Sequence, residues 1–201
     1  MESKTPTPGE VIEAIIARGE KVDTDKEVIG LHEVLLSVFG EHGWDDSALD
    51  TARRVVRYWH EFHQHESTFV FTCFPTVVNQ LIVVKDIEFS SLCSHHLLPF
   101  YGVAHVGYIP NKLMVGLSKI PRLVDWCAHH PNTQEALTAS IASFMKDKLA
   151  AMGVAVVINS RHTCMACRGA KAFNASMITS EMRGVFLTSG EARSEFLELI
   201  K

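Results

Sequence analysis

The spacing of apolar residues changes from helical to strand-like near residue 81, and this change divides the chain. Before it, "KEVIGLHEVLLSVFGEHG" (26–43) and "DDSALDTARRVVRYWHEFHQH" (45–65) carry apolar residues three and four positions apart, as amphipathic helices do. A shorter amphipathic stretch, "GEVIEAIIARG" (9–19), follows a polar arm at residues 1–8. The first third of the chain is therefore predicted to be helical.

Strand patterns enter the chain with "LIVVKDIEFS" (81–90), a half-buried strand in which Lys85 interrupts the alternation. One side of this strand is expected to carry Leu81, Val83, Ile87 and Phe89. Further strands are predicted at 101–110, 154–162 and 170–186, and helices at 118–130, 132–153 and 191–200, the second of them stopping at Gly153. This order of elements predicts an α+β fold built on an antiparallel sheet.

Length and charge narrow the class of protein. The 201 residues suit one main domain, expected at 67–201, with an N-terminal helical extension at 1–66. The formal net charge of −4 gives no bulk attraction to nucleic acid or anionic lipid. Because the N-terminus lacks an apolar signal core and no stretch is long enough to cross a bilayer, we expect a cytoplasmic protein without membrane or nucleic-acid partners.

Cysteine usage points to metal or catalytic chemistry. Five cysteines is an odd number, which argues against a disulfide framework and for reduced thiols. In "SLCSHHLLPF" (91–100), Cys93 and His96 have the C-x-x-H spacing that lets two ligands converge on one zinc ion. Cys164, in "HTCMACRG" (162–169), is the candidate third ligand. Three protein ligands leave the fourth tetrahedral position for water, as catalytic zinc sites do.

The neighbouring histidines and cysteines leave alternatives open. His95 and His162 are candidates for proton transfer, and His162 is expected on the same strand face as Cys164, while an extended loop would point His95 away from the ligands. The alternative is that all these residues are buried core side chains. Cys164 and Cys167 also form C-x-x-C, which allows a redox role, while Cys73 and Cys127 are expected in the core.

Two further segments have both structural and functional interpretations. In "GLSKIPRLV" (116–124), Ser118 is a good helix N-cap, and Lys119 and Arg122 share a face at the helix start, where a phosphate would bind, although such residues often only face solvent. Arg168 is a further candidate cation. Glu135 lies three residues after Asn132, so its carboxylate either completes a capping box or accepts paired hydrogen bonds from a guanine.

These motifs together resemble the GTP cyclohydrolase I family. The matching pieces are "SLCSHHLLPFYG", "GYIPNK", "GLSKIPRLV", "TQEALT", "HTCMACRG" and "EFLELI", in family order over residues 81–200, with a looser match at "DTARRVVRYW". The resemblance implies a zinc enzyme that hydrolytically opens the imidazole ring of GTP, releases formate and forms 7,8-dihydroneopterin triphosphate. It also implies the tunnelling fold, with helices on one face of the sheet, and a homodecamer with active sites at subunit boundaries.

The resemblance also implies a role for each candidate residue. Cys93, His96 and Cys164 would hold zinc, and His95 and His162 would transfer protons. Glu135, helped by Gln134, would anchor the guanine. Ser118, Lys119, Arg122 and Arg168 would bind ribose and triphosphate, with Arg54 reaching from a neighbouring subunit. The chain departs from the family pattern at Ser94, where an acidic residue is typical, and at Cys167.

Two other classes of function compete with the enzyme. In a binding module, zinc would be structural and would take a fourth protein ligand, for which Cys167 is the obvious candidate. In a thiol-disulfide exchange protein, Cys164 and Cys167 would react with each other and no metal would be needed. A fourth protein ligand would favour the binding module, and zinc analysis separates the thiol-disulfide exchange protein from the other two.

Overall fold

The computed structural model describes residues 26–40, 47–63 and 69–201. The predicted arm at 1–8, the helix at 9–19 and the expected domain boundary after residue 66 lie outside these residues. The chain divides into two compact units, Met1–Gln64 and His65–Lys201. No helix in the described part of the chain combines the length and the hydropathy that crossing a lipid bilayer requires.

Two amphipathic helices form the described part of the first unit. They are α2 (Lys26–Phe39) and α3 (Ala48–His63), both predicted from their apolar spacing. Their facing apolar stripes bury Val28, Leu49, Ala52 and Val56 in a small core of their own. The imidazole Nε2 of His60 on α3 lies 2.5 Å from a carboxylate oxygen of Glu27 on α2, which ties the two helices together at their polar edge.

A five-stranded sheet organises the second unit, in the order β5-β2-β3-β6-β7. The pairs β2–β3, β3–β6 and β6–β7 are antiparallel, and only the two-residue β5 pairs in parallel with β2. The strands are β2 (Ile82–Cys93), β3 (Pro99–Ile109), β5 (Pro131–Asn132), β6 (Gly153–His162) and β7 (Met177–Gly184). The short β1 (Cys73–Pro75) and β4 (Leu113–Val115), which the sequence pattern did not reveal, form a separate pair.

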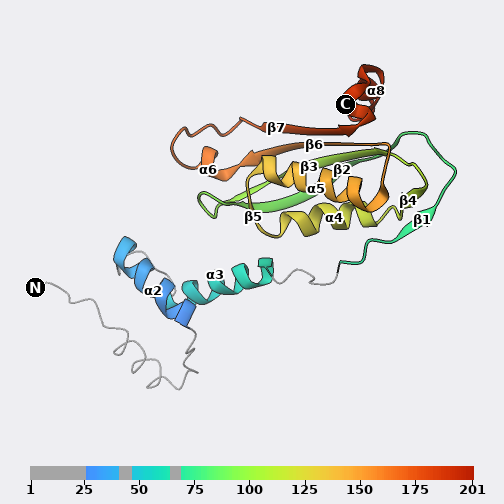
Figure 1. Cartoon of the computed structure of the whole chain (residues 1–201). Coiled ribbons are helices and arrows are strands. Elements are labelled where there is room, and N and C mark those ends of the chain that lie inside the picture. The colour runs from blue at the N-terminus through green and yellow to red at the C-terminus, as the bar shows by residue number, and fades with distance from the viewer. Residues whose placement is uncertain (1–25, 41–46, 64–68) are drawn as a thin grey trace, which may run out of the picture. The chain divides into compact units, whose positions relative to one another are not determined.

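Helices α4 (Lys119–Ala128) and α5 (Gln134–Leu149) lie side by side across one face of the sheet (Figure 1). Between them and the sheet is the main core, which includes Phe100, Leu123, Ile141 and Val156. Cys127 lies at its margin, where burial raises the pKa of the thiol to about 12. The prediction of an α+β fold with an antiparallel sheet and helices on one face is confirmed, with α4 and α5 as those helices.

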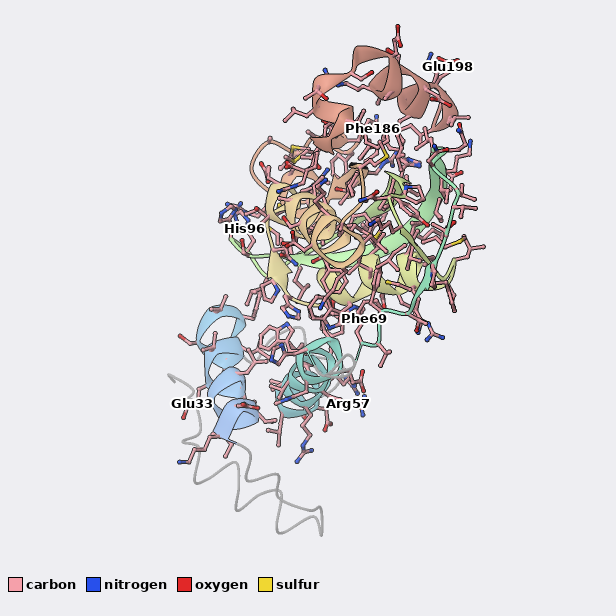
Figure 2. The ribbon with its side chains drawn as sticks, turned by 45° about the vertical axis from the view of Figure 1, so that its right-hand side comes forward. Glu33, Arg57, Phe69, His96, Phe186 and Glu198 are labelled. Carbon is pink, nitrogen blue, oxygen red and sulfur yellow. The ribbon has the colours of Figure 1, made fainter. Side chains whose placement is uncertain are left out.

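The C-terminal helices cover part of the opposite face of the sheet. These are α7 (Val185–Thr188) and α8 (Gly190–Leu199), whose Phe186 and Phe196 are fully buried against Ala155 and Val157. Figure 2 shows Phe186 between the sheet and the C-terminal helix. Because Val154 and Val156 face α5 while Ala155 and Val157 face α8, β6 is buried on both faces, which explains its continuous apolar run.

A β-bulge in β2 corrects the predicted side assignment of that strand. The pairing register with β3 shifts between Val84 and Ile87, and Asp86 has a positive φ of 59°. The extra residue reverses the alternation, so Leu81 and Val83 face the α8 side whereas Ile87 and Phe89 face the main core. The prediction that these four residues share one side was therefore wrong, and the interruption at Lys85 marks the place.

Several predicted ends also differ from the structure. Helix α5 ends at Leu149 with Ala150 in the left-handed conformation, and Gly153 begins β6 instead of ending the helix. The strand predicted at 170–186 is limited to β7, because residues 185–188 turn into α7. The short helix α6 (Thr163–Ala166) begins directly after β6.

Candidate metal centre

Three of the predicted ligands come together at one end of the sheet. Cys93 is the last residue of β2, His96 lies in the β2–β3 loop, and Cys164 lies in α6 just beyond β6. The two sulfur atoms and one imidazole nitrogen all lie within 4.8 Å of one another, and His96 Nδ1 is 3.7 Å from Cys93 Sγ. Elsewhere in the described ranges, no three His, Cys, Asp or Glu side chains gather in this way.

A compact turn, rather than an extended loop, places the two histidines. The backbone N–H groups of His96 and Leu97 donate to the Cys93 carbonyl, and the Cys93 N–H donates to the Leu98 carbonyl. Leu97 takes a positive φ of 52° to close this turn. His95 therefore does not point away as an extended loop would require: its Nδ1 lies 4.0 Å from Cys93 Sγ. Figure 2 shows His96 at the outer margin of the unit.

The electrostatics of the cluster suit a cation. Burial raises the pKa of the Cys164 thiol and the neighbouring Cys93 raises it further, while a backbone hydrogen bond at Cys164 and the Arg168 guanidinium oppose this. Two adjacent thiols resist joint ionisation because their negative charges would repel, and a divalent cation between them removes that penalty. Two sulfurs and an imidazole are a donor set that zinc prefers, so the residues fit the metal that the sequence predicts.

Arg168 and Cys167 lie beside the cluster in different ways. Arg168 Nη1 lies 2.8 Å from His96 Nε2, which places its cation at the cluster, as predicted from its sequence position. The thiol of Cys167 instead donates to the Thr163 carbonyl at 2.8 Å and is exposed. Cys167 is not part of the group of converging ligand atoms.

His162 ends β6 next to the cluster. Its ring stacks on Phe100, with centroids 4.6 Å apart and planes 3° from parallel. Its Nε2 lies 2.8 Å from Gln134 Oε1. Burial lowers the pKa of His162, and the nearby carboxylate of Glu135 partly opposes this. The expectation that His162 and Cys164 share a strand face does not apply, because the strand stops at His162 and Cys164 is helical.

Gln134 and Glu135 begin α5 and differ in exposure. Gln134 is 1% exposed and Glu135 is exposed. The N-cap is Thr133, whose hydroxyl accepts from the Ala136 N–H at 3.2 Å. Asn132 belongs to β5 and donates to backbone carbonyls. The capping-box interpretation of Asn132 and Glu135 was therefore wrong, and the Glu135 carboxylate is not needed as a cap.

The candidate phosphate residues lie at the far end of α4 from the metal cluster. The C-terminal end of α4 is tied to the cluster end of β2, because Ser91 donates to the Ala128 carbonyl at 2.6 Å. The N-terminal end of α4 follows β4, where the Val115 N–H donates to the Tyr108 hydroxyl. Tyr108 of β3 is paired with Ile82, at the end of β2 away from the cluster. A ten-residue helix spans roughly 15 Å, so Lys119 lies about one helix length from the end of α4 that is tied to the cluster, and Arg122 lies about one turn closer.

Ser118 precedes α4 but does not cap it with its side chain. Its backbone is already helical (φ −67°, ψ −13°), and its hydroxyl makes no capping hydrogen bond, contrary to the N-cap expectation. Arg54 lies on α3, in the first unit. The structure therefore brings together Cys93, His95, His96, His162, Cys164, Arg168 and the start of α5, and leaves Ser118, Lys119 and Arg122 apart from them.

Residues around His162 were missed from the sequence, although a signal was present. Positions 154, 156 and 158 of β6 are apolar and face the helices, and the same face continues with Ser160 and His162. Polar residues that continue a buried apolar face need hydrogen-bond partners. Gln134 supplies one, since Ser160 Oγ donates to its Oε1 at 2.6 Å.

Comparison with known proteins identifies the family. The profile described as GTP cyclohydrolase I matches residues 30–201. GTP cyclohydrolase 1 of Hydrogenobaculum sp. (strain Y04AAS1) is 41% identical over 182 residues, covering 90% of this chain and 99% of that protein. The enzyme of the same name from Sulfurihydrogenibium sp. (strain YO3AOP1) is 43% identical over 169 residues, covering 83% and 90%.

A third relative and one solved structure complete the comparison. GTP cyclohydrolase 1 of Listeria innocua serovar 6a is 40% identical over 187 residues, covering 90% of this chain and 98% of that protein. The apo crystal structure of the archaeosine synthase QueF-Like matches with a TM-score of 0.43 at 16% identity, over 52% of this chain and 93% of that chain, and supports no conclusion here. The profile and the relatives confirm the resemblance that the motifs indicated: this chain belongs to the GTP cyclohydrolase I family.

Proposed function

We propose that this chain hydrolytically opens the imidazole ring of GTP, releases carbon 8 as formate and forms 7,8-dihydroneopterin triphosphate, a step of pterin biosynthesis. Family membership supports this reaction. The observation that carries it is the convergence of Cys93, His96 and Cys164 within 4.8 Å, beside two further histidines. We assign the reaction to the residues 67–201 domain, which contains the whole cluster.

We propose zinc as the metal, held by Cys93, His96 and Cys164. Zinc bound by these residues supplies a Lewis acid that activates water near neutral pH. The three residues leave room for a non-protein ligand, because Cys167 lies outside the group and its thiol donates a hydrogen bond to the Thr163 carbonyl. This arrangement supports a catalytic site over a closed structural one, and the convergence of Cys164 on Cys93 and His96 supports a metal site over a thiol-exchange pair.

The histidines and Glu135 act on the base. The exposed Glu135 carboxylate accepts two hydrogen bonds from the N–H groups that a guanine presents along one edge. His162 and His95 exchange protons as the imidazole ring of the substrate opens, and His162 delivers its proton to guanine N7. The lowered pKa of His162 favours the neutral ring, in which one ring nitrogen is free to accept a proton.

Phosphate and ribose binding requires a second copy of the chain. Ser118, Lys119 and Arg122 lie at the opposite end of α4 from the metal cluster, so they serve the cluster of a neighbouring subunit in a homodecamer. The cations and the free N–H groups at the start of α4 suit a triphosphate. Arg168 joins them from the chain that holds the metal, and Arg54 contributes from a neighbouring subunit.

The proposal is tested with purified, zinc-loaded protein and GTP. We expect formate and a fluorescent oxidised pterin to appear in equal amounts. Cys164→Ser removes a proposed metal ligand and should yield neither product. Cys167→Ser makes the same chemical change outside the ligand group, and this matched control should yield both products. Absence of both products from the zinc-loaded, assembled wild type would contradict the proposed reaction.

A further inference from the structure

Gln134 is a fully buried polar side chain whose hydrogen bonds all go to protein. It begins α5 and reaches the ends of β6 and β7. Its Nε2 donates to the carbonyls of Ile158 and Met177, at 3.1 and 3.0 Å, and to the Thr179 hydroxyl at 3.0 Å. Its Oε1 accepts from Ser160 Oγ at 2.6 Å and lies 2.8 Å from His162 Nε2. The side chain therefore connects His162, at the end of β6, to α5 and β7.

The partners of Gln134 fix which way its amide points. Backbone carbonyls only accept hydrogen bonds, so the amide atom that faces Ile158 and Met177 must be the NH₂ group. The Thr138 hydroxyl donates to the Gln134 backbone carbonyl at 2.7 Å, which leaves Thr179 to donate to Thr138 and to accept from Gln134. The amide oxygen consequently faces His162. Because an amide oxygen only accepts, Nε2 of His162 must carry a hydrogen.

The ring of His162 is held on a second side by stacking. Its plane lies 3° from that of the buried Phe100, at a centroid distance of 4.6 Å. With the ring stacked on Phe100 and Nε2 bonded to Gln134, both its position and its rotation are fixed. Within the described ranges Nδ1 has no protein hydrogen-bond partner, so it is the nitrogen left for chemistry.

We infer that Gln134 is a positioning residue: it holds His162 in the tautomer with hydrogen on Nε2, so that Nδ1 exchanges the proton with the substrate. This inference rests on the proposed function and replaces the expectation that Gln134 helps to bind the guanine. Both lone pairs of its Oε1 are used, and its two N–H bonds already face three acceptors. The side chain has no hydrogen-bonding capacity left for a base.

Steady-state kinetics of Gln134→Met tests the assignment. Methionine keeps a similar length but cannot accept from His162, so we expect kcat for formate release to fall by roughly 10- to 100-fold while the KM for GTP changes by less than about threefold. Gln80→Met makes the same chemical change at an exposed glutamine and should behave as wild type. A raised KM with unchanged kcat would mean that Gln134 contacts the substrate, and would overturn the inference.

A measurement on the wild type decides the tautomer without a substitution at Gln134. This matters because Gln134→Met removes the NH₂ group that donates to Ile158, Met177 and Thr179, and the variant can fail to fold. Zinc-loaded protein containing ¹⁵N-histidine is studied by NMR at about pH 8.5, two units above the reference pKa of histidine. The His162 signals are identified by their loss in His162→Asn. We expect a protonated Nε2 and an unprotonated Nδ1, and the reverse would overturn the inference. If wild-type protein released no formate, the proposed function would fail, but this spectrum would still report the tautomer.

Discussion

Cys164 and Cys167 lie on the same helical turn, yet the structure gives their thiols different partners. Cys164 faces Cys93 and His96, whereas Cys167 is exposed and donates to the Thr163 carbonyl. A metal held by this cluster would therefore depend on one of these cysteines and not on the other. The difference separates an open metal site from the closed site of a structural zinc module.

At the residue scale we predict that Cys164→Ser loses bound zinc and Cys167→Ser keeps it. A serine hydroxyl does not replace a thiolate as a zinc ligand near neutral pH, because its proton is far more tightly held. The zinc content per chain, measured by elemental analysis after dialysis, should fall towards zero in the first variant and stay near one in the second. Loss of zinc from both variants would make Cys167 a ligand and contradict the open site.

The ligands were predictable from the sequence, but the role of Gln134 was not. Cys93 and His96 are close in sequence at a spacing that suits a metal, and Cys164 lies in a separate motif at 162–169. The hydrogen bonds of Gln134, in contrast, exist only because α5, β6 and β7 meet around its side chain. A sequence reveals which groups can donate or accept, but not which of them the fold has already paired.

At the element scale, Gly102 of β3 lies directly against the backbone of β6, close to the site. A Cβ atom placed on Gly102 would lie 2.0 Å from the Asn159 carbonyl oxygen and 2.6 Å from Ser160 Cα. Both neighbours are backbone atoms of β6 and cannot move without disturbing the pairing. The glycine therefore allows the strand pairing that places Ser160 and His162.

We predict that Gly102→Ala lowers the free energy of unfolding by more than about 2 kcal/mol, as steric overlap with a packed backbone does. Gly190→Ala is the matched control, because nothing lies within 4 Å of a Cβ at that position. Denaturant unfolding of both variants measures the effect. Equal stabilities would mean that β3 and β6 are not packed as described.

The bulge in β2 is held by a buried histidine of β3. The Asp86 N–H donates to His105 Nδ1 at 3.2 Å, which requires an unprotonated nitrogen. Burial lowers the pKa of His105, Lys85 lowers it further and Asp86 partly opposes this. The alternation of β2 could be predicted from its sequence but not the reversal at the bulge, because the reversal depends on this contact with the neighbouring strand.

The lowered pKa makes stability depend on pH in a definite direction. Below the reference pKa of about 6.5 the unfolded chain binds a proton at His105 before the folded chain does, so stability falls as the pH drops from there through the folded pKa. Above about 6.5 both states are neutral and this contribution is constant. We predict that His105→Gln, which keeps an acceptor but does not titrate, shows a smaller loss of Tm between about pH 7.5 and 5.5 than wild type. An identical loss would contradict this role.

At the scale of the whole molecule, the two halves of the candidate site lie at opposite ends of α4. The metal ligands and His162 are at one end, and Lys119 and Arg122 are at the other. The sequence predicted both halves, but the distance between them depends on the direction in which α4 crosses the sheet. An assembly of several copies reconciles one active site with this separation, and it would also cover the exposed Phe74 and Leu117 near the start of α4.

We predict that two inactive variants recover activity when they assemble into mixed oligomers. Cys164→Ser lacks the metal and Lys119→Ala lacks a phosphate cation, so each homo-oligomer should release little formate. After unfolding and joint refolding at equal amounts, chance pairing of two intact halves should return about one quarter of the wild-type sites. Formate release from the mixture measures the recovery, and the separately refolded variants are the control. No recovery in a mixed oligomer would place both halves of the site on one chain.

The proposed chemistry depends most directly on a metal ion that has one coordination position not taken by a protein ligand. X-ray absorption at the zinc edge of the assembled wild type counts the atoms around the ion. We predict two sulfur neighbours, from Cys93 and Cys164, with lighter atoms in the remaining positions. Three sulfur neighbours would mean that Cys167 closes the site, and would contradict the proposal that water reaches the metal.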